Sequence, residues 1–230
     1  PDLRFLVLVL TMRKEGDMLP EVTLKSVTRD DVDRIAWWLE DVDLTNRWFG
    51  RYGVDDPVHP GYDPRHMLEA NDREWRSTFS DPRRDILSIY NAADAHIGEC
   101  QVHLDGDGGA ELSLIIGRKD LWHHGYGTAT MLALLDKVFD EMHVGRAWVA
   151  VPADNRPAIG LFEKLGFTID RDRTVTHGSI GVAFMTVSFG RYSSRESRAQ
   201  QELTRTPVVA IAGLPGSDSE ALGREVARLL

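Results

Sequence analysis

The sequence predicts an α/β protein of the α+β kind, and two patterns carry the prediction. Residues 85–90, 97–104 and 111–116 are short runs rich in apolar and β-branched residues. Polar turns separate the three runs, so we expect an antiparallel meander. Residues 111–142 then pass from the last of these strands, through a turn that contains glycines, into an amphipathic helix.

The N-terminal part of this region predicts one further strand and two helices. Residues 21–27 alternate as a strand, and Thr28 is placed to cap a helix with Asp31 three residues on. Residues 46–64 contain aromatic residues, prolines and glycines, which predict a loop or a broken helix. A second helix is expected over residues 65–79.

The part that follows the central helix predicts a strand, a short helix and a final strand pair. The strand covers residues 146–151, and the helix covers 155–165 with Pro157 in its first turn, where proline is tolerated. Gly166 is expected to end this helix. A strand that begins over residues 167–170 is expected to pair with residues 182–189.

Composition and charge narrow the class of protein. The chain has 230 residues, 42% of them apolar, which is ordinary for a soluble globular protein. Its net charge of −9 argues against nucleic acid as a partner and favours a cationic one. The apolar run 5–10 is too short to span a membrane, and the single cysteine, Cys100, favours a reducing cytoplasm. We expect a monomer or a homodimer without a metal site.

A pair of glycines opens the central helix. Gly125 and Gly127 stand where a helix begins, and free backbone N–H groups gather there at the positive end of the helix dipole. Glycine has no Cβ, so an anionic ligand can approach the backbone closely. The expected ligand is a phosphate group.

The string 116–128, IGRKDLWHHGYGT, resembles the acyl-CoA-binding motif of the GNAT superfamily of N-acetyltransferases, in its ribosomal-protein and aminoglycoside branch. The resemblance implies that the strand meets the pantetheine arm of acetyl-CoA and that the glycine loop cradles its pyrophosphate. The commonest pattern has Arg or Gln at Trp122 and often a basic residue at His124. Histidine is mostly neutral at pH 7, so backbone amides would supply most of the phosphate contact. The residues so assigned are Leu114, Ile115, Ile116, His123, His124, Gly125, Tyr126, Gly127 and Thr128.

The string 152–167, PADNRPAIGLFEKLGF, resembles the second motif of the same family. The resemblance implies that Asn155 contacts the cofactor and that the short helix, with Phe162, packs beside the pantetheine. Together the two motifs imply a domain over residues 21–189, with a mixed, mostly antiparallel sheet and helices on both sides. The family's usual general acid is a tyrosine at the position of Phe162, so that role is vacant. Solvent, or another group such as His103, would protonate the leaving thiolate; packing is the alternative role for this histidine.

Acetyl transfer to an amine requires a base, and Glu111 is the candidate. It matches the acidic residue of the family's core strand and would act through water, because an ordinary carboxylate is too weak a base to deprotonate an alkylammonium directly. A structural role, bonded to backbone or paired with Arg118, is the alternative. The N–H groups of residues 114–116, freed from the sheet by a bulge, would hold the oxyanion.

Acidic and aromatic residues are the candidates for binding the amine acceptor. Glu40 and Asp41 are candidates for holding a cationic substrate, with solvation as the alternative. Trp48, with Trp37, Trp38 and Trp75, would line an aromatic pocket; core packing is the alternative for Trp38 and Trp75.

The sequence therefore predicts an acetyl-CoA-dependent N-acetyltransferase that acts on a primary amine of a small molecule or a protein N-terminus. We expect residues 1–20 to be a disordered lead-in and 190–206 a linker. Residues 207–230 resemble the start of a cytidylate-kinase-like P-loop domain, although Ser219 and Glu220 stand in place of its Lys and Ser/Thr pair. An alternative is therefore a non-catalytic acyl-CoA-binding module that regulates an attached nucleotide kinase.

Overall fold

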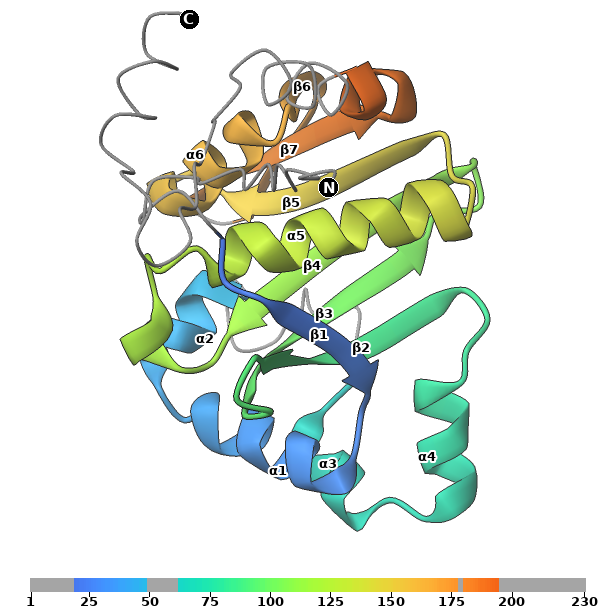
Figure 1. Cartoon of the computed structure of the whole chain (residues 1–230), viewed down its shortest axis with the longest axis vertical. Coiled ribbons are helices and arrows are strands. Elements are labelled where there is room, and N and C mark those ends of the chain that lie inside the picture. Colours follow the sequence, from blue (N-terminus) through green and yellow to red (C-terminus); the bar gives the residue numbers. More distant parts are fainter. Residues whose placement is uncertain (1–18, 49–61, 178–179, 195–230) are drawn as a thin grey trace, which may run out of the picture. The chain divides into compact units, whose positions relative to one another are not determined.

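A seven-stranded sheet forms the centre of the computed structural model, which describes residues 19–48, 62–177 and 180–194 (Figure 1). The strand order is β1-β2-β3-β4-β5-β7-β6, and each neighbouring pair is antiparallel except β4 with β5, which is parallel. The predicted mixed, mostly antiparallel sheet is confirmed. The strands are β1 (Val22–Ser26), β2 (Arg84–Asn91), β3 (His96–Leu104), β4 (Gly109–Ile116), β5 (Arg146–Pro152), β6 (Thr168–His177) and β7 (Ile180–Ser188).

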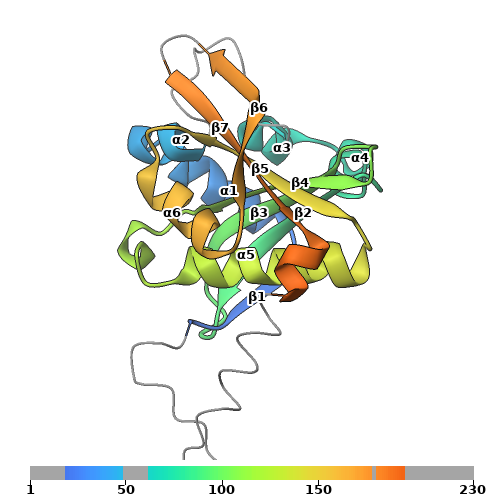
Figure 2. The same ribbon diagram turned by 90° about the horizontal axis from the view of Figure 1, so that it is seen from above.

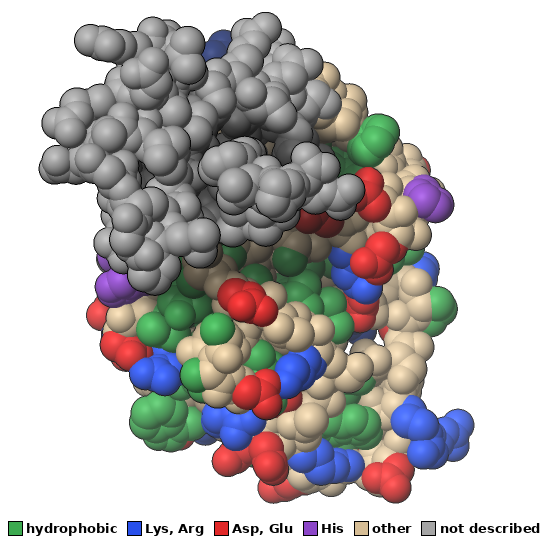
Figure 3. Space-filling view, in the orientation of Figure 1, with side chains coloured by type: hydrophobic (Ala, Val, Ile, Leu, Met, Phe, Trp, Pro, Cys, Tyr) green, Lys and Arg blue, Asp and Glu red, His purple; other side chains and the backbone are tan. Residues whose placement is uncertain are grey.

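Helices cover both faces of the sheet (Figures 1 and 2). Four of them lie on one face: α1 (Arg29–Trp38), α2 (Val42–Trp48), α3 (Pro64–Glu69) and α4 (Asp72–Phe79). The other face carries α5 (Tyr126–Asp136), which continues as a π-helical turn over Lys137–Glu141, and α6 (Arg156–Lys164). Figure 3 shows the surface in the orientation of Figure 1. Acidic and basic side chains are interspersed on the described region.

The two faces of β4 bury different kinds of residue. Successive side chains of a strand point to opposite faces, and Leu112, Leu114 and Ile116 pack in the main apolar core with α5 and α6. Ile115 faces the other way and packs against Ile35, Trp38 and Leu44 of α1 and α2. Glu111 therefore lies on the α1 face, not on the α5 face.

One predicted helix is interrupted. The helix expected over residues 65–79 is two helices, α3 and α4, because Ala70 adopts an extended conformation with ψ of 141°. The Asn71 side chain then accepts hydrogen bonds from the N–H groups of Arg73 and Glu74 and starts α4. An asparagine is more favourable at such a helix N-cap than inside a helix. Within the predicted loop 46–64, residues 49–61 lie outside the described residues.

The folded unit extends beyond the expected domain end at residue 189. It runs from Leu19 to Ser194, and residues 189–194 are helical. Tyr192 is 2% exposed and donates a hydrogen bond from its hydroxyl to Asp136 Oδ1 at 2.6 Å. Residues 190–194 are thus part of the domain and not of a linker. The rest of that linker, the P-loop-like segment 207–230 and residues 1–18 of the expected lead-in 1–20 lie outside the described residues.

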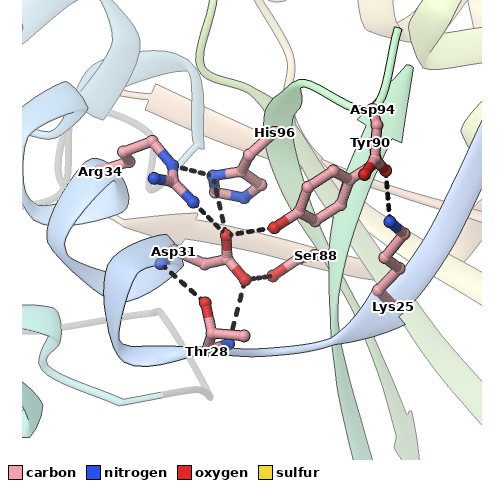
Figure 4. Close-up of polar contacts among 8 residues, drawn as sticks. All are labelled: Lys25, Thr28, Asp31, Arg34, Ser88, Tyr90, Asp94 and His96. Atoms are coloured by element: carbon pink, nitrogen blue, oxygen red, sulfur yellow. Dashed lines mark hydrogen bonds and ion pairs between the residues drawn. The ribbon is translucent and has the colours of Figure 1, made fainter. Parts of the chain in front are cut away.

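A buried carboxylate joins α1 to the sheet (Figure 4). Thr28 and Asp31 form the predicted capping box, and Asp31 is 1% exposed. Its carboxylate accepts hydrogen bonds from Ser88 Oγ at 2.9 Å, from the Tyr90 hydroxyl at 2.8 Å and from Arg34 Nη2 at 2.5 Å. Burial opposes ionisation of this carboxyl, but the hydrogen bonds from Tyr90 and Thr28 outweigh it and hold the pKa of Asp31 below its usual range. The ionised form is therefore part of the folded structure.

Replacing Asp31 with Asn should lower the free energy of unfolding by about 1–3 kcal/mol at pH 7, because buried donors lose a charged acceptor. A folded-state pKa below the unfolded value of about 3.9 stabilises the protein above that pH, and this contribution is lost as pH falls. The difference between wild type and Asp31→Asn should therefore shrink at pH 3–4. Urea unfolding measures both effects. The control is Asp33→Asn at an exposed position of the same helix; an equal loss in both variants would contradict the assignment.

Candidate cofactor and acceptor site

The two parallel strands of the sheet are paired for a short distance only. Among the described residues, β4 and β5 pair at three positions, from Gly109 with Arg146 to Glu111 with Trp148. The Gly117 N–H donates to the Ile97 carbonyl of β3 at 2.9 Å. Because backbone groups alternate in direction along a strand, the N–H groups of Leu114 and Ile116 point to the opposite edge of β4. This edge faces β5 after the two strands have separated.

The expected bulge in β4 is not present. Its register with β3 runs without a shift from Gly98↔Ile116 to Leu104↔Ala110. Separation of β4 from β5, rather than an extra residue, leaves the N–H groups of this edge without a strand partner. At the end of the edge, the Ile116 carbonyl accepts a hydrogen bond from Trp122 Nε1 at 2.7 Å.

A cavity of about 610 Å³ lies at this edge. It brings together most of the predicted cofactor residues, from β4, from the loop that precedes α5 and from the start of α6. These are Leu114, Ile115, Ile116, His123, Gly125, Gly127, Thr128 and Asn155.

Three predicted cofactor residues do not line this cavity. His124 is exposed beside it, and Tyr126 packs against the apolar core. Phe162 is 9% exposed and packs in the core with Phe167, with ring centroids 5.4 Å apart. The position at which the resemblance implies a tyrosine is thus held by a core side chain that has no proton to give.

The start of α5 has the features expected of an anion site. Gly125 has φ of +87°, a left-handed conformation that favours glycine, and its carbonyl accepts the Ala129 N–H at 2.9 Å to open the helix. No described side chain caps this N-terminus. The first N–H groups of α5 are therefore available to a ligand at the cavity.

Two basic residues at the same cavity were missed in the sequence. Arg156 and Lys164, at the two ends of α6, both line it. Neither is paired with a described residue. Arg156 directly follows the predicted Asn155, and this adjacency is the signal that could have identified it. The expectation that backbone amides supply most of the phosphate contact stays a prediction, and these two cations add side chains to the candidate contacts.

The predicted substrate residues Glu40 and Asp41 line a second cavity, of about 760 Å³. They do not line the first cavity. Glu40 accepts a hydrogen bond from Arg65 at 3.2 Å. Asp41 pairs with Lys119 Nζ at 2.5 Å, and the hydrogen bond from Lys119 lowers the pKa of Asp41. Both carboxylates already have cationic partners. Trp48 ends α2, and its side chain is not described.

The other tryptophans take different positions. Trp38 is 8% exposed and packs on His96, with ring centroids 5.1 Å apart. Trp75 packs on Phe79. Both therefore have packing roles. Trp37 is 68% exposed at the rim of the second cavity.

Glu111 lies where β4 and β5 part. It is half-buried opposite His103 of β3 and beside Trp148 of β5. Burial raises the pKa of Glu111, while the positive charge of Arg173 lowers it in part. The alternative pairing with Arg118 is not formed, because Arg118 binds Asp120 at 2.5 Å. The carboxylate is thus close to the exposed edge of β4 and has a raised pKa.

Parted parallel strands, a helix N-terminus without a side-chain cap and two cations with no partner among the described residues meet at one cavity. This arrangement would suit a long ligand with phosphate groups. The sequence model of the acetyltransferase (GNAT) domain family matches residues 21–168, more than half of the chain. The chain therefore belongs to this family. Acetyl-CoA-dependent N-acetyltransferase activity, predicted from the two motifs, is confirmed at the level of the family. No curated protein sequence matches the chain.

Solved structures agree on the fold. A spermidine N-acetyltransferase from Vibrio cholerae, in complex with CoA and spermine, has a TM-score of 0.59 at 17% identity, over 75% of this chain and 98% of that one. A chimera of this enzyme has the same TM-score and identity, over 76% of this chain and 99% of that chain. A structure described as a probable acetyltransferase matches at 16% identity with a TM-score of 0.59, over 74% of this chain and 93% of that chain. These identities support the fold and not the acceptor.

The described residues contain no helix long and apolar enough to cross a membrane. They also contain no group of three or more His, Cys, Asp or Glu side chains arranged to hold a metal ion.

Gly117 is required at the end of β4 because of its neighbour. A Cβ at this position would lie 2.0 Å from Cε3 of the buried Trp38. Gly117→Ala should therefore lower the free energy of unfolding by about 1–3 kcal/mol, the usual cost of overpacking. Gly160→Ala is the matched control, since nothing lies within 4 Å of its Cβ and alanine favours the helix. Urea unfolding midpoints compare the stability of the two variants. A midpoint unchanged by Gly117→Ala would contradict this prediction, because it would show that Trp38 can move without a loss of stability.

Proposed function

We propose that the protein transfers the acetyl group of acetyl-CoA to a primary amine of a small cationic molecule or of a protein N-terminus. The observation that carries this proposal is the cavity along the free edge of β4. Its wall includes a helix N-terminus without a side-chain cap and two cations that have no partner among the described residues. A long ligand with an apolar arm and an anionic end matches such a cavity in shape and charge.

The cofactor would lie along the cavity with its charged end at α5 and α6. The pyrophosphate would accept hydrogen bonds from the N–H groups of residues 125–128 and face Arg156 and Lys164. The pantetheine arm would follow residues 114–116. The side-chain Oδ1 of Asn155 already accepts the Ala158 N–H at 3.3 Å, so the side-chain NH₂ is the group that would donate to the cofactor.

The reaction would take place where β4 and β5 part. A neutral amine attacks the thioester carbonyl, a C–N bond forms, and the C–S bond breaks. The outward N–H groups of Leu114 and Ile116 would hold the carbonyl oxygen as it gains negative charge. Keeping an alkylamine neutral at pH 7 costs roughly 4–5 kcal/mol for a pKa near 10.4. Glu111 would take the amine proton through water, and its raised pKa makes it a better base than an exposed glutamate.

Two lines of support favour a cationic acceptor. The acidic chain would attract cations, and the similar structures include a spermidine N-acetyltransferase bound to CoA and spermine. The leaving thiolate, with a pKa of about 8.5, would be protonated by solvent, because Phe162 has no proton to give. A cytoplasmic setting and a monomer or homodimer remain predictions; one similar spermidine N-acetyltransferase is dodecameric.

Release of free thiol from acetyl-CoA, measured with a panel of amines, tests this function. Amine-dependent release is the expected result. If acetyl-CoA binds but no amine of the panel causes release of free thiol, the regulatory-module alternative would be favoured. That alternative rests on residues 207–230, which are outside both the described residues and the matched family region.

Arg156→Ala should weaken acetyl-CoA binding about tenfold, because it removes a positive charge beside the phosphates and changes little else; tenfold corresponds to about 1.4 kcal/mol. Lys164→Ala should act in the same direction. The control is Arg73→Ala, an exposed arginine of α4. Isothermal titration calorimetry measures the affinities, and equal values for Arg156→Ala and Arg73→Ala would remove Arg156 from the site.

Glu111→Gln should lower kcat at least tenfold while acetyl-CoA affinity stays within twofold, because the amide cannot accept a proton. The acidic limb of the pH–rate profile should flatten, since burial raises the pKa of Glu111 above the usual glutamate range in the wild type. Steady-state kinetics between pH 5 and pH 9 measure both effects. A variant that keeps full activity would leave Glu111 with a structural role.

A further inference from the structure

Two aromatic side chains lie beside Glu111 on the same face of the sheet. Trp148 is the β5 residue directly paired with Glu111, and Phe184 of β7 pairs with Ala150, two residues further along β5. The Trp148 and Phe184 ring centroids are 6.0 Å apart. Both rings are half-buried and Ala150 is exposed, so the rings are in part accessible to solvent.

A guanidinium group of the same chain covers both rings. Arg173 Cζ lies 4.5 Å from the Trp148 ring centroid and 4.9 Å from that of Phe184. Arg173 is exposed, and it belongs to the edge strand β6, whose register with β7 shifts between Ile169 and Thr174. Among the described residues it forms no ion pair. It is held by the rings, and cations over aromatic rings are bound weakly when exposed to solvent.

One carboxylate strengthens the preference of this site for a cation, and a second orients its indole. Glu111 lies beside Trp148 and within the electrostatic reach of Arg173. Asp105 accepts a hydrogen bond from Trp148 Nε1 at 3.1 Å, which fixes the orientation of the indole. The same carboxylate also accepts hydrogen bonds from Arg146 Nη2 at 3.2 Å and from the N–H groups of Asp107 and Gly109. Aromatic faces with a nearby carboxylate are a recurrent site for organic ammonium groups.

We propose that Trp148 and Phe184 bind a second positive charge of the acceptor, and that Arg173 occupies this site until the acceptor displaces it. The inference rests on the proposed function, and it defines the acceptor class as an amine with at least two cationic groups. Trp148 is one strand from Glu111 and Phe184 is two. The second charge should therefore lie about 5–10 Å from the reacting amine, since neighbouring strands are about 4.8 Å apart.

Kinetics with linear diamines of three to eight carbons, and with butylamine as the single-charge reference, test this proposal. Phe184→Leu should raise the KM for the best diamine roughly three- to tenfold, because the ring face is lost. The KM for butylamine and for acetyl-CoA should change less than twofold. Phe184→Tyr should restore diamine binding because it keeps the ring. Phe189→Leu, at an exposed phenylalanine outside this site, is the control for the substitution.

Arg173→Ala should lower the KM for diamines about two- to fivefold, because the competing cation is removed. It should also move the acidic limb of the pH–rate profile to higher pH, because the positive charge that lowers the pKa of Glu111 is lost. The other groups around Glu111, Asp105 and His103, are unchanged in this variant. A side chain that only supported the fold would not shift the pH profile in this way.

The possible outcomes separate the two proposals. Absence of thiol release with every amine would overturn the proposed function. Thiol release with an unchanged diamine preference in Phe184→Leu would overturn the cation site and leave the function intact. A raised KM in Arg173→Ala would show that this arginine contacts an anionic part of the acceptor, which also contradicts the proposal. Urea midpoints within 1 M of wild type would establish that each variant is folded.

Discussion

The site depends on one constraint, the loss of pairing between β4 and β5 after Glu111 and Trp148. A buried N–H group without a partner costs about 1–3 kcal/mol. The N–H groups of Leu114 and Ile116 avoid much of this cost because their edge borders an open cavity, where water or a ligand can accept the bonds. The same geometry that would weaken an ordinary sheet thus creates donors that face the cavity. The remaining parts of the site lie around this edge.

Charge is divided along β4 and its neighbours in a protein whose net charge is −9. Arg156 and Lys164, together with the start of α5, make one end suitable for phosphates. Glu111, at the point where β4 and β5 part, carries a carboxylate that would suit a cation. An anionic cofactor and a cationic acceptor would therefore approach the reacting atoms from opposite ends. Such an arrangement reduces the chance that either ligand occupies the other's place.

Local signals explain what the sequence could predict, and long-range contacts explain what it could not. The capping box of Thr28 and the left-handed Gly125 depend on neighbouring residues, and both are visible as short patterns. Strand separation in place of a bulge depends on a partner strand more than thirty residues away. The pairing of Asp41 with Lys119 likewise joins distant segments. The sequence shows Asp41 as a free carboxylate for a cationic substrate, but in the structure it already forms an ion pair. Asn71 fits either a helix interior or a cap, and only packing decides between them.

The alternation of side chains along a strand also explains why reactive groups lie on one face. The α5 face of β4 and its neighbours forms the main apolar core, which stabilises the sheet. The opposite face carries Glu111 on β4 and, on β3, Glu99, which is 1% exposed and bonded by Gln101 Nε2 at 2.8 Å. Burial raises the pKa of Glu99 to about 7. Charged groups on the α5 face would have disrupted the core that positions the cavity. Because the period of a strand is two residues, one strand can support the core with alternate side chains and present titratable groups with the others.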